Sequence, residues 1–167
     1  MTLWLVGMMG SGKTSAGGLA ADTLGVPFLD TDAEISRRMG CSVAQLWGDL
    51  GESAFRDMER AAIQRVAGTE AVVGTGGGAI LDETNRRTMH ESGTVVWLTA
   101  PAETLAKRVG SGPERPLLAK DSDVAANLAA ILDERARAYA ESADEQIDTD
   151  SRTVAEVAEK IAESWPH

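Results

Sequence analysis

The sequence predicts a three-layer α/β domain, in which helices cover both faces of a doubly wound parallel sheet. Two observations carry this prediction. Short apolar runs alternate with longer helix-like segments along the chain, and uninterrupted apolar runs are typical of strands buried on both faces. An alternating order of strands and helices implies β-α-β crossovers, which place helices on both sides of a parallel sheet. Because the chain has 167 residues, we expect one domain over residues 1–167.

Five short apolar runs are expected to form the strands. The clearest is Thr94-Val95-Val96-Trp97-Leu98, in which every residue suits a buried strand. The weakest candidate is Gln146-Ile147-Asp148, which has only one apolar residue. In chain order, the five runs lie at residues 3–6, 27–29, 71–73, 94–98 and 146–148.

The segments between these runs have the character of helices. Glu52 to Val66 places apolar residues such as Phe55, Met58 and Ala62 at helical spacing, and Pro101 suits the first turn of a helix. Residues 110–123 break the pattern, because two glycines and two prolines there favour a mobile loop. The other helical segments are expected at residues 13–24, 32–40, 42–50, 82–91, 101–109, 124–140 and 153–163.

Composition and charge exclude several classes of protein. The chain has 16 basic and 26 acidic side chains, a net charge of −10, so neither duplex nucleic acid nor an anionic membrane is expected as a partner. A single cysteine, Cys41, excludes an intramolecular disulfide or a cysteine-based metal site and fits a reducing cytoplasm. No apolar run reaches the length of a transmembrane helix. The N-terminal segment lacks a charged leader, so no signal peptide is expected.

A phosphate-binding loop follows the first apolar run. Residues 7–14 read GMMGSGKT and match the pattern G-x-x-x-x-G-K-[ST] in full. Glycines let the backbone N–H groups point to one concave site, and the next helix adds its positive N-terminal end. Lys13 can reach the β- and γ-phosphates, and the Thr14 hydroxyl can ligate Mg²⁺. We expect ATP to contact Gly10, Ser11, Gly12, Lys13, Thr14 and Ser15.

The loop alone does not separate a small-molecule kinase from a GTPase or a motor protein. The guanine-reading segment N-K-x-D of Ras-type GTPases does not occur in the chain. The length also leaves little room for an effector or motor apparatus. We therefore interpret the sequence as a nucleoside, nucleotide or metabolite kinase.

Asp30-Thr31-Asp32 ends the second apolar run. In a doubly wound sheet, the carboxyl ends of the strands line the ligand crevice. One carboxylate there can hold the Mg²⁺ shell while the other faces an acceptor hydroxyl. Alternatively, the segment is a helix N-cap, and the two roles are compatible.

Three consecutive glycines, Gly76 to Gly78, follow the third apolar run. Without side chains, they allow a ligand to lie directly on the backbone amides. The alternative is a flexible turn, but the position at a strand end favours a binding role.

Three arginines have both a functional and a structural interpretation. Helical spacing favours an ion pair of Arg56 with Glu52 or Glu59. Arg115 lies in the glycine- and proline-rich loop, where it can close over a transferring phosphate or remain solvated. Arg135 lies within a long helical segment and could simply be an exposed helix charge.

Together these segments resemble the shikimate kinases, from Leu3 to about Ile161. The phosphate loop is generic, whereas the combination of the other motifs is specific to this family. Gluconate kinases share the size and the loop but lack the G-E-x-x-F-R-x-x-E and G-G-G segments. The shared segments are GMMGSGKT (7–14), DTDAEI (30–35), GESAFRDMER (51–60), TGGGAI (75–80), RPLL (115–118) and ERARAYAESAD (134–144).

The resemblance implies a five-stranded parallel sheet in the order 2-3-1-4-5. It also implies MgATP-dependent phosphorylation of the 3-hydroxyl of shikimate, within chorismate and aromatic amino-acid biosynthesis. Shikimate would bind to a subdomain at about 31–60, and a lid at about 110–121 would close over the site. The expected protein is a cytoplasmic monomer whose ligands are shikimate, ATP and Mg²⁺. The alternatives are another small metabolite kinase, such as a gluconate kinase, and a nucleotide-binding module without turnover.

The resemblance also implies the roles of the acceptor-site residues. Asp32 would contact the reacting hydroxyl and orient it or accept its proton. Arg56 and Arg135 would clamp the carboxylate of shikimate, because guanidinium groups suit bidentate pairing. Gly76, Gly77 and Gly78 would pack against the ring and its hydroxyls.

On the nucleotide side, the resemblance implies that Thr14 ligates Mg²⁺ directly and that Asp30 holds it through water. Lys13 and Arg115 would hold the transferring phosphate, and Arg108 and Arg152 would flank the adenine. Several basic side chains would then form a local positive pocket on a negative molecule, namely Lys13, Arg56, Arg108, Arg115 and Arg135.

Overall fold

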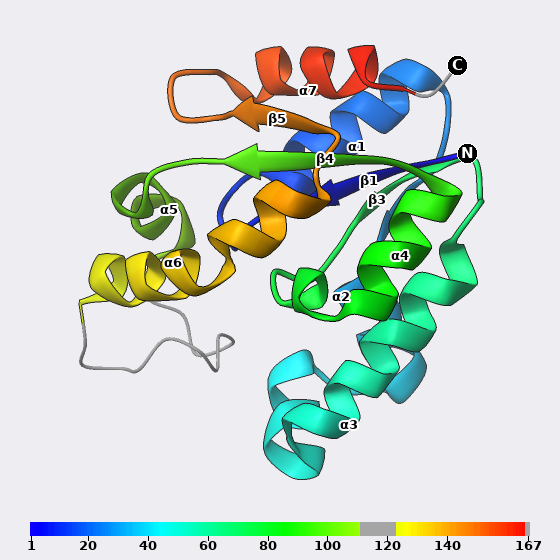
Figure 1. Cartoon of the computed structure of the whole chain (residues 1–167), viewed down its shortest axis with the longest axis vertical. Coiled ribbons are helices and arrows are strands. Elements are labelled where there is room, and N and C mark those ends of the chain that lie inside the picture. Colours follow the sequence, from blue (N-terminus) through cyan, green and yellow to red (C-terminus); the bar gives the residue numbers. More distant parts are fainter. Residues whose placement is uncertain (111–122, 166–167) are drawn as a thin grey trace.

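A five-stranded parallel sheet forms the centre of the computed structural model, which describes residues 1–110 and 123–165 (Figure 1). The strands lie in the spatial order β2-β3-β1-β4-β5, which confirms the expected order, and the weakest candidate, at 146–148, is a strand. At the carboxyl end of β1, Leu5 pairs with Gly74 and with Val96. The strands are β1 (Thr2–Val6), β2 (Phe28–Asp30), β3 (Ala71–Gly74), β4 (Gly93–Thr99) and β5 (Glu145–Asp148).

The helices agree with the predicted segments to within a few residues, with three differences. The two helices expected at 42–50 and 52–66 form one element that breaks at Gly51, where φ is 84° and ψ is 169°. Pro101 precedes α5 as its N-cap instead of entering the first turn. The short helix η1 (Ala79–Leu81) was not expected. The α-helices are α1 (Lys13–Leu24), α2 (Thr31–Met39), α3 (Val43–Val66), α4 (Glu83–Ser92), α5 (Ala102–Val109), α6 (Val124–Ser142) and α7 (Val154–Glu163).

The sheet separates two apolar cores, as expected for a three-layer domain. Leu3 and Leu5 of β1 face the core that α1 and α7 cover. Trp4 and Val6, on the opposite face of the same strand, lie in the core that α3, α4, α5 and α6 cover. Figure 1 shows these two helix layers on either side of the strands. Burial on both faces explains why β1 is a continuous apolar run.

A third, smaller core holds α2 against α3. Its buried residues are Ile35 of α2 and Leu46, Phe55 and Ala62 of α3. In Figure 1, the first half of α3 lies far from the strands of the sheet. This part of the chain overlaps the range of about 31–60, and the substrate-binding subdomain expected there stays a prediction. The lid expected at about 110–121 lies, apart from Gly110, outside the described residues.

The carboxyl ends of β1, β2 and β3 meet at one edge of the sheet. The phosphate loop follows β1, the Asp30 segment ends β2, and Thr75 with the three glycines follows β3. A crevice at such an edge is the usual ligand site of a doubly wound fold.

Within residues 1–110 and 123–165, no helix is both long and apolar enough to cross a membrane.

Candidate active site

The phosphate loop connects β1 to the N-terminus of α1. Gly10 and Gly12 have φ values of 80° and 97°, which side chains with a Cβ rarely adopt. Gly12 is the N-cap of α1 and makes no side-chain cap hydrogen bond, so the N–H groups of the first turn can bind an anion. The Lys13 ammonium donates to the carbonyl oxygens of Gly7 and Met8, at 2.7 and 2.9 Å. The loop therefore has the backbone geometry that the motif predicts.

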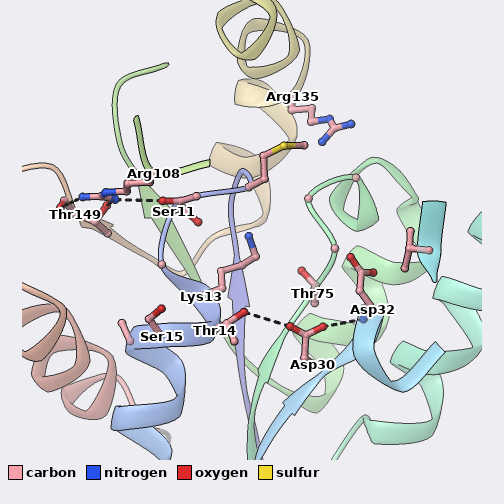
Figure 2. Close-up of a pocket in the computed structure, with 18 of the residues that line it drawn as sticks. Ser11, Lys13, Thr14, Ser15, Asp30, Asp32, Thr75, Arg108, Arg135 and Thr149 are labelled. Carbon is pink, nitrogen blue, oxygen red and sulfur yellow. Dashed lines mark hydrogen bonds between the residues drawn. The ribbon is translucent and has the colours of Figure 1, made fainter. Parts of the chain in front are cut away.

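Asp30 joins the phosphate loop to α2. Its Oδ1 accepts hydrogen bonds from the backbone N–H groups of Asp32 and Ala33, both at 3.0 Å, so Asp30 is the N-cap of α2. Its Oδ2 accepts a hydrogen bond from the Thr14 hydroxyl at 3.3 Å (Figure 2). Capping and a position at the phosphate loop therefore occur together.

Thr14 and Asp30 offer the kind of donors that suit Mg²⁺. A hydroxyl and a carboxylate are hard oxygen ligands, and Mg²⁺ usually takes one or two of these together with water and substrate phosphates. No group of three or more acidic, histidine or cysteine side chains forms a metal cage within the described ranges. The donor set therefore fits a magnesium ion that arrives with a nucleotide.

Asp32 lies in the first turn of α2 and points into the cleft beside Asp30 (Figure 2). Its Oδ1 is buried and has no hydrogen-bond partner among the described residues. Burial, and then the negative charge of Asp30, raises the pKa of Asp32 to about 6, although Lys13 and Arg56 act in the opposite direction. A buried carboxylate oxygen without a partner is suited to accept a hydrogen bond from a ligand.

Arg56 combines the ion pairs that helical spacing favours with a place in the cleft. Its Nη1 lies 2.8 Å from Glu59 Oε2, and its Nη2 lies 3.6 Å from Glu52 Oε1, as helical spacing favours. The guanidinium also lines the cleft, with its Cζ 5.2 Å from the ring centre of Trp47. The ion pairs and the aromatic ring therefore orient an arginine that faces the cleft.

Glu59 also lines the cleft, although its sequence pattern indicates only an ion-pair partner of Arg56. Its side chain is 1% exposed, and Oε1 has no hydrogen-bond partner in the described part of the chain. Burial raises its pKa to about 7, although Arg56 lowers it. The available signal was its spacing from Phe55 and Ile63, which puts Glu59 on the buried face of α3.

Space, and not backbone conformation, disfavours a side chain at Gly76 and Gly78. None of the three glycines is among the described glycines with positive φ. A Cβ on Gly76 would lie 2.6 Å from Glu59 Oε1 and 2.8 Å from Asp32 Oδ1, and a Cβ on Gly78 would lie 2.6 Å from Arg56 Nη1. The segment is therefore packed closely against charged side chains and is not a flexible turn.

Arg135 lies in the cleft beside Gly77. This position corrects its interpretation as an exposed helix charge. The residue is 6% exposed and lines the cleft. Its Nη1 lies 3.3 Å from the point that a Cβ on Gly77 would occupy. One turn later on α6, the buried Tyr139 hydroxyl donates to the Gly77 carbonyl oxygen at 2.6 Å. Tyr139 was not singled out in the sequence.

Arg108 and Arg152 lie at the opposite end of the cleft from Asp32. Arg108 donates to the Gly10 carbonyl at 3.3 Å, and to the carbonyl and the hydroxyl of Thr149 at 2.8 and 2.9 Å. Arg152 donates to the Asp148 carbonyl. Figure 2 shows Arg108 and Thr149 on one side of the phosphate loop, and Asp32 and Arg135 on the other.

One cleft of about 870 Å³ contains both the end with Arg108 and the end with Asp32. Every predicted site residue in the described ranges lines it, whereas Arg115 lies outside those ranges. The basic residues Lys13, Arg56, Arg108, Arg135 and Arg152 line the cleft together with the acidic residues Asp30, Asp32 and Glu59, so the local positive pocket stays a prediction. The cleft also includes residues that the sequence analysis had not assigned to a site, among them Val43, Trp47, Glu59, Thr75 and Thr149.

Comparisons with known proteins agree with this geometry. The family model for shikimate kinases matches residues 9–165. Curated shikimate kinases from Moorella thermoacetica and Persephonella marina are 44% and 39% identical to this chain. The alignments cover 96% and 95% of this chain and 91% and 95% of theirs.

Solved structures give the same assignment. A shikimate kinase from Acinetobacter baumannii in complex with shikimate has a TM-score of 0.91 and 35% identity, covering 96% of this chain and 89% of its own. A gluconokinase from Sinorhizobium meliloti has a TM-score of 0.54 and 19% identity, covering 98% and 90%, so it shares the fold alone. The chain therefore belongs to the shikimate kinase family.

Proposed function

We propose that this protein transfers the γ-phosphoryl group of MgATP to the 3-hydroxyl of shikimate, giving shikimate 3-phosphate and ADP in chorismate and aromatic amino-acid biosynthesis. The observation that carries the proposal is the place of the unpartnered Asp32 oxygen. It lies in the cleft that the phosphate loop, Arg56 and Arg135 also line. A phosphate donor and an anionic acceptor can therefore approach the same carboxylate from two sides.

The acceptor would be held mainly through its carboxylate. Arg56 and Arg135 come from different helices and face the same end of the cleft, so both guanidinium groups can pair with one carboxylate. The segment from Gly76 to Gly78 would lie against the ring and its hydroxyls. In this proposal, residues at about 31–60 form the substrate-binding subdomain, and a lid at about 110–121 closes after both substrates have bound.

Asp32 would orient the acceptor hydroxyl and take its proton. The hydroxyl oxygen forms a bond to the γ-phosphorus, the bond between that phosphorus and the ADP oxygen breaks, and the hydroxyl proton passes to Asp32. A carboxyl with a pKa of about 6 is ionised at neutral pH but is more basic than an ordinary aspartate, which suits a general base.

The rest of the site would place and neutralise the phosphates, which is the main requirement of phosphoryl transfer. Lys13 would exchange its loop carbonyl partners for phosphate oxygens, and Arg115 would join it at the transferring group. Thr14 directly, and Asp30 through water, would hold Mg²⁺, which neutralises charge on the β- and γ-phosphates when it is bound. The adenine would lie between Arg108 and Arg152.

We further propose that the enzyme acts as a monomer in the cytoplasm. The described cleft brings the phosphate loop, Asp32 and both acceptor-site arginines together within one chain, which supports a monomer. The single cysteine fits a reducing compartment.

A coupled assay of ADP release tests the proposal directly. Purified protein with MgATP is given shikimate or gluconate in parallel reactions, and ADP is measured in each. We expect ADP release that depends on shikimate and does not rise with gluconate. Release driven by gluconate would indicate another metabolite kinase, and no release with either compound would indicate a binding module without turnover.

A further inference from the structure

Tyr139 is a buried phenol beside the acceptor end of the cleft, and the proposed mechanism does not use it. The residue is 0% exposed. Its ring stacks on Trp97 of β4, with ring centres 5.3 Å apart and an interplanar angle of 11°. Its hydroxyl donates to the Gly77 carbonyl oxygen at 2.6 Å. The phenol therefore connects α6 and the sheet to the glycine segment.

The same phenol also contacts Arg135. Arg135 precedes Tyr139 by four residues on α6, which puts both side chains on one face of the helix. The Arg135 Nη1 and the phenol oxygen both lie next to Gly77, 3.3 and 3.7 Å from the point that a Cβ there would occupy. Burial raises the pKa of the phenol, whereas the charge of Arg135 lowers it. The phenol O–H is donated to the Gly77 carbonyl, so the lone pairs of the phenol oxygen can face the Arg135 guanidinium, which can only donate.

We propose that Tyr139 is a positioning residue of the acceptor site, which holds the Arg135 guanidinium and the Gly77 backbone in a fixed relation to each other. The inference rests on the proposed function, because the groups it aligns are those assigned to the carboxylate and the ring of shikimate. Tyr139 itself touches neither substrate in this proposal and acts through its two partners.

The physical reason is the flexibility of an arginine side chain. Arg135 has several rotatable bonds, and ordering them when the substrate arrives would weaken binding. Contact with a phenol that is itself fixed by stacking on Trp97 would order the guanidinium beforehand. The O–H bond to Gly77 fixes the other side of the same contact, so one hydroxyl sets the distance between the two parts of the acceptor site.

The variant Tyr139→Phe tests this role, because it keeps the stacked ring and removes only the hydroxyl. We expect the KM for shikimate to rise about 5- to 20-fold, as for the loss of hydrogen bonds at a charged group. The kcat and the KM for ATP should change less than about twofold. Shikimate carboxamide lacks the negative charge that Arg135 would recognise in this proposal, so its KM should rise much less than the KM for shikimate. The ratio of the carboxamide KM to the shikimate KM should therefore fall.

A matched control is Ser142→Ala on the same helix. Ser142 is also buried, and its hydroxyl bonds to the Ala138 carbonyl within α6, at a position that does not line the cleft. It should leave both KM values and the carboxylate preference unchanged. A double-mutant cycle provides a second readout, because Tyr139→Phe should add little to the KM change of Arg135→Ala if it acts through that arginine.

Several outcomes would overturn the positioning role. An unchanged KM for shikimate, an equal loss for shikimate and its carboxamide, or full additivity with Arg135→Ala would each do so. A Tyr139→Phe protein that no longer folds would assign the hydroxyl to stability alone and would also overturn it. Failure of the proposed function is recognised separately, because the wild-type protein would then release no ADP with shikimate.

Discussion

Replacing Glu59 by glutamine should make the protein more stable at neutral and alkaline pH. The Glu59 side chain is 1% exposed and has one carboxyl oxygen without a partner among the described residues. Ionising such a group in the folded protein is costly, and its pKa is raised for that reason. Glutamine keeps the size and shape of the side chain without the charge, so Glu59→Gln removes this cost.

The magnitude follows from the difference between the unfolded and folded pKa. The pKa of Glu59 rises from 4.5 to about 7 on folding, and at about 1.4 kcal/mol for each pH unit this corresponds to about 3 kcal/mol. The folded protein binds this proton more tightly than the unfolded chain does. Wild-type stability therefore falls as the pH rises from about 4.5 to about 7, and the variant escapes this loss. The gain should be about 3 kcal/mol at pH 8 and less than about 1 kcal/mol at pH 5.

Urea unfolding at pH 8 and pH 5, followed by the fluorescence of the four tryptophans, measures both values. Glu52→Gln is the matched control, because Glu52 is the other carboxylate beside Arg56 but is 63% exposed. The control should change the free energy of unfolding by less than about 0.5 kcal/mol at either pH. This contrast separates the effect of burial from the effect of losing an ion-pair partner.

The reasoning would be refuted if Glu59→Gln were no more stable than the wild type at pH 8, or if its gain were the same at both pH values. Activity should fall in the Glu59→Gln variant although its stability rises, because Arg56 loses the charged partner that orients it. We expect a higher KM for shikimate in this variant. Greater stability with weaker substrate binding is the usual trade-off when a strained group belongs to an active site.

Three further substitutions separate the roles within the cleft, each measured by shikimate-dependent ADP release. Lys13→Ala should reduce kcat at least about 1,000-fold, because the transferring phosphate loses its main positive contact. Asp32→Asn should reduce kcat about 100- to 10,000-fold with little change in the KM for shikimate, and wild-type kcat should itself fall as the pH drops through about 6 and Asp32 becomes protonated. Arg135→Ala should raise the KM for shikimate about 100-fold with a smaller effect on kcat. Wild-type kcat in Asp32→Asn, or tight shikimate binding in Arg135→Ala, would contradict these assignments.

The sheet and the phosphate loop could be predicted because their sequence signals are local. A strand buried on both faces must be apolar throughout, as β1 and β4 largely are, and a loop with left-handed backbone at Gly10 and Gly12 requires glycine. Even the break at Gly51 was visible as a boundary between two helical segments. These features depend on neighbours in the sequence and not on distant parts of the chain.

The polar interior of the site could not be predicted in the same way. Helical spacing assigned Arg56 to an ion pair and left Arg135 on an exposed surface, and only the resemblance to a family placed them in the cleft. Glu59, Tyr139 and Thr149 were not assigned to the site, because the burial of a polar side chain depends on what packs over it from elsewhere in the chain. Glu59 and Arg135 are faced by groups from other helices, which no local pattern reveals.

The close approach of Gly76 and Gly78 to charged side chains has a consequence for how this site can evolve. A methyl group at position 76 would collide with the carboxylates of Asp32 and Glu59, and one at position 78 with Arg56. These positions therefore constrain each other across three separate segments. A larger side chain at either position requires a shift of the charged side chain that it meets. We therefore expect the acceptor site to change slowly in evolution. A redesign of its specificity should change the glycine segment and the charged side chains beside it together.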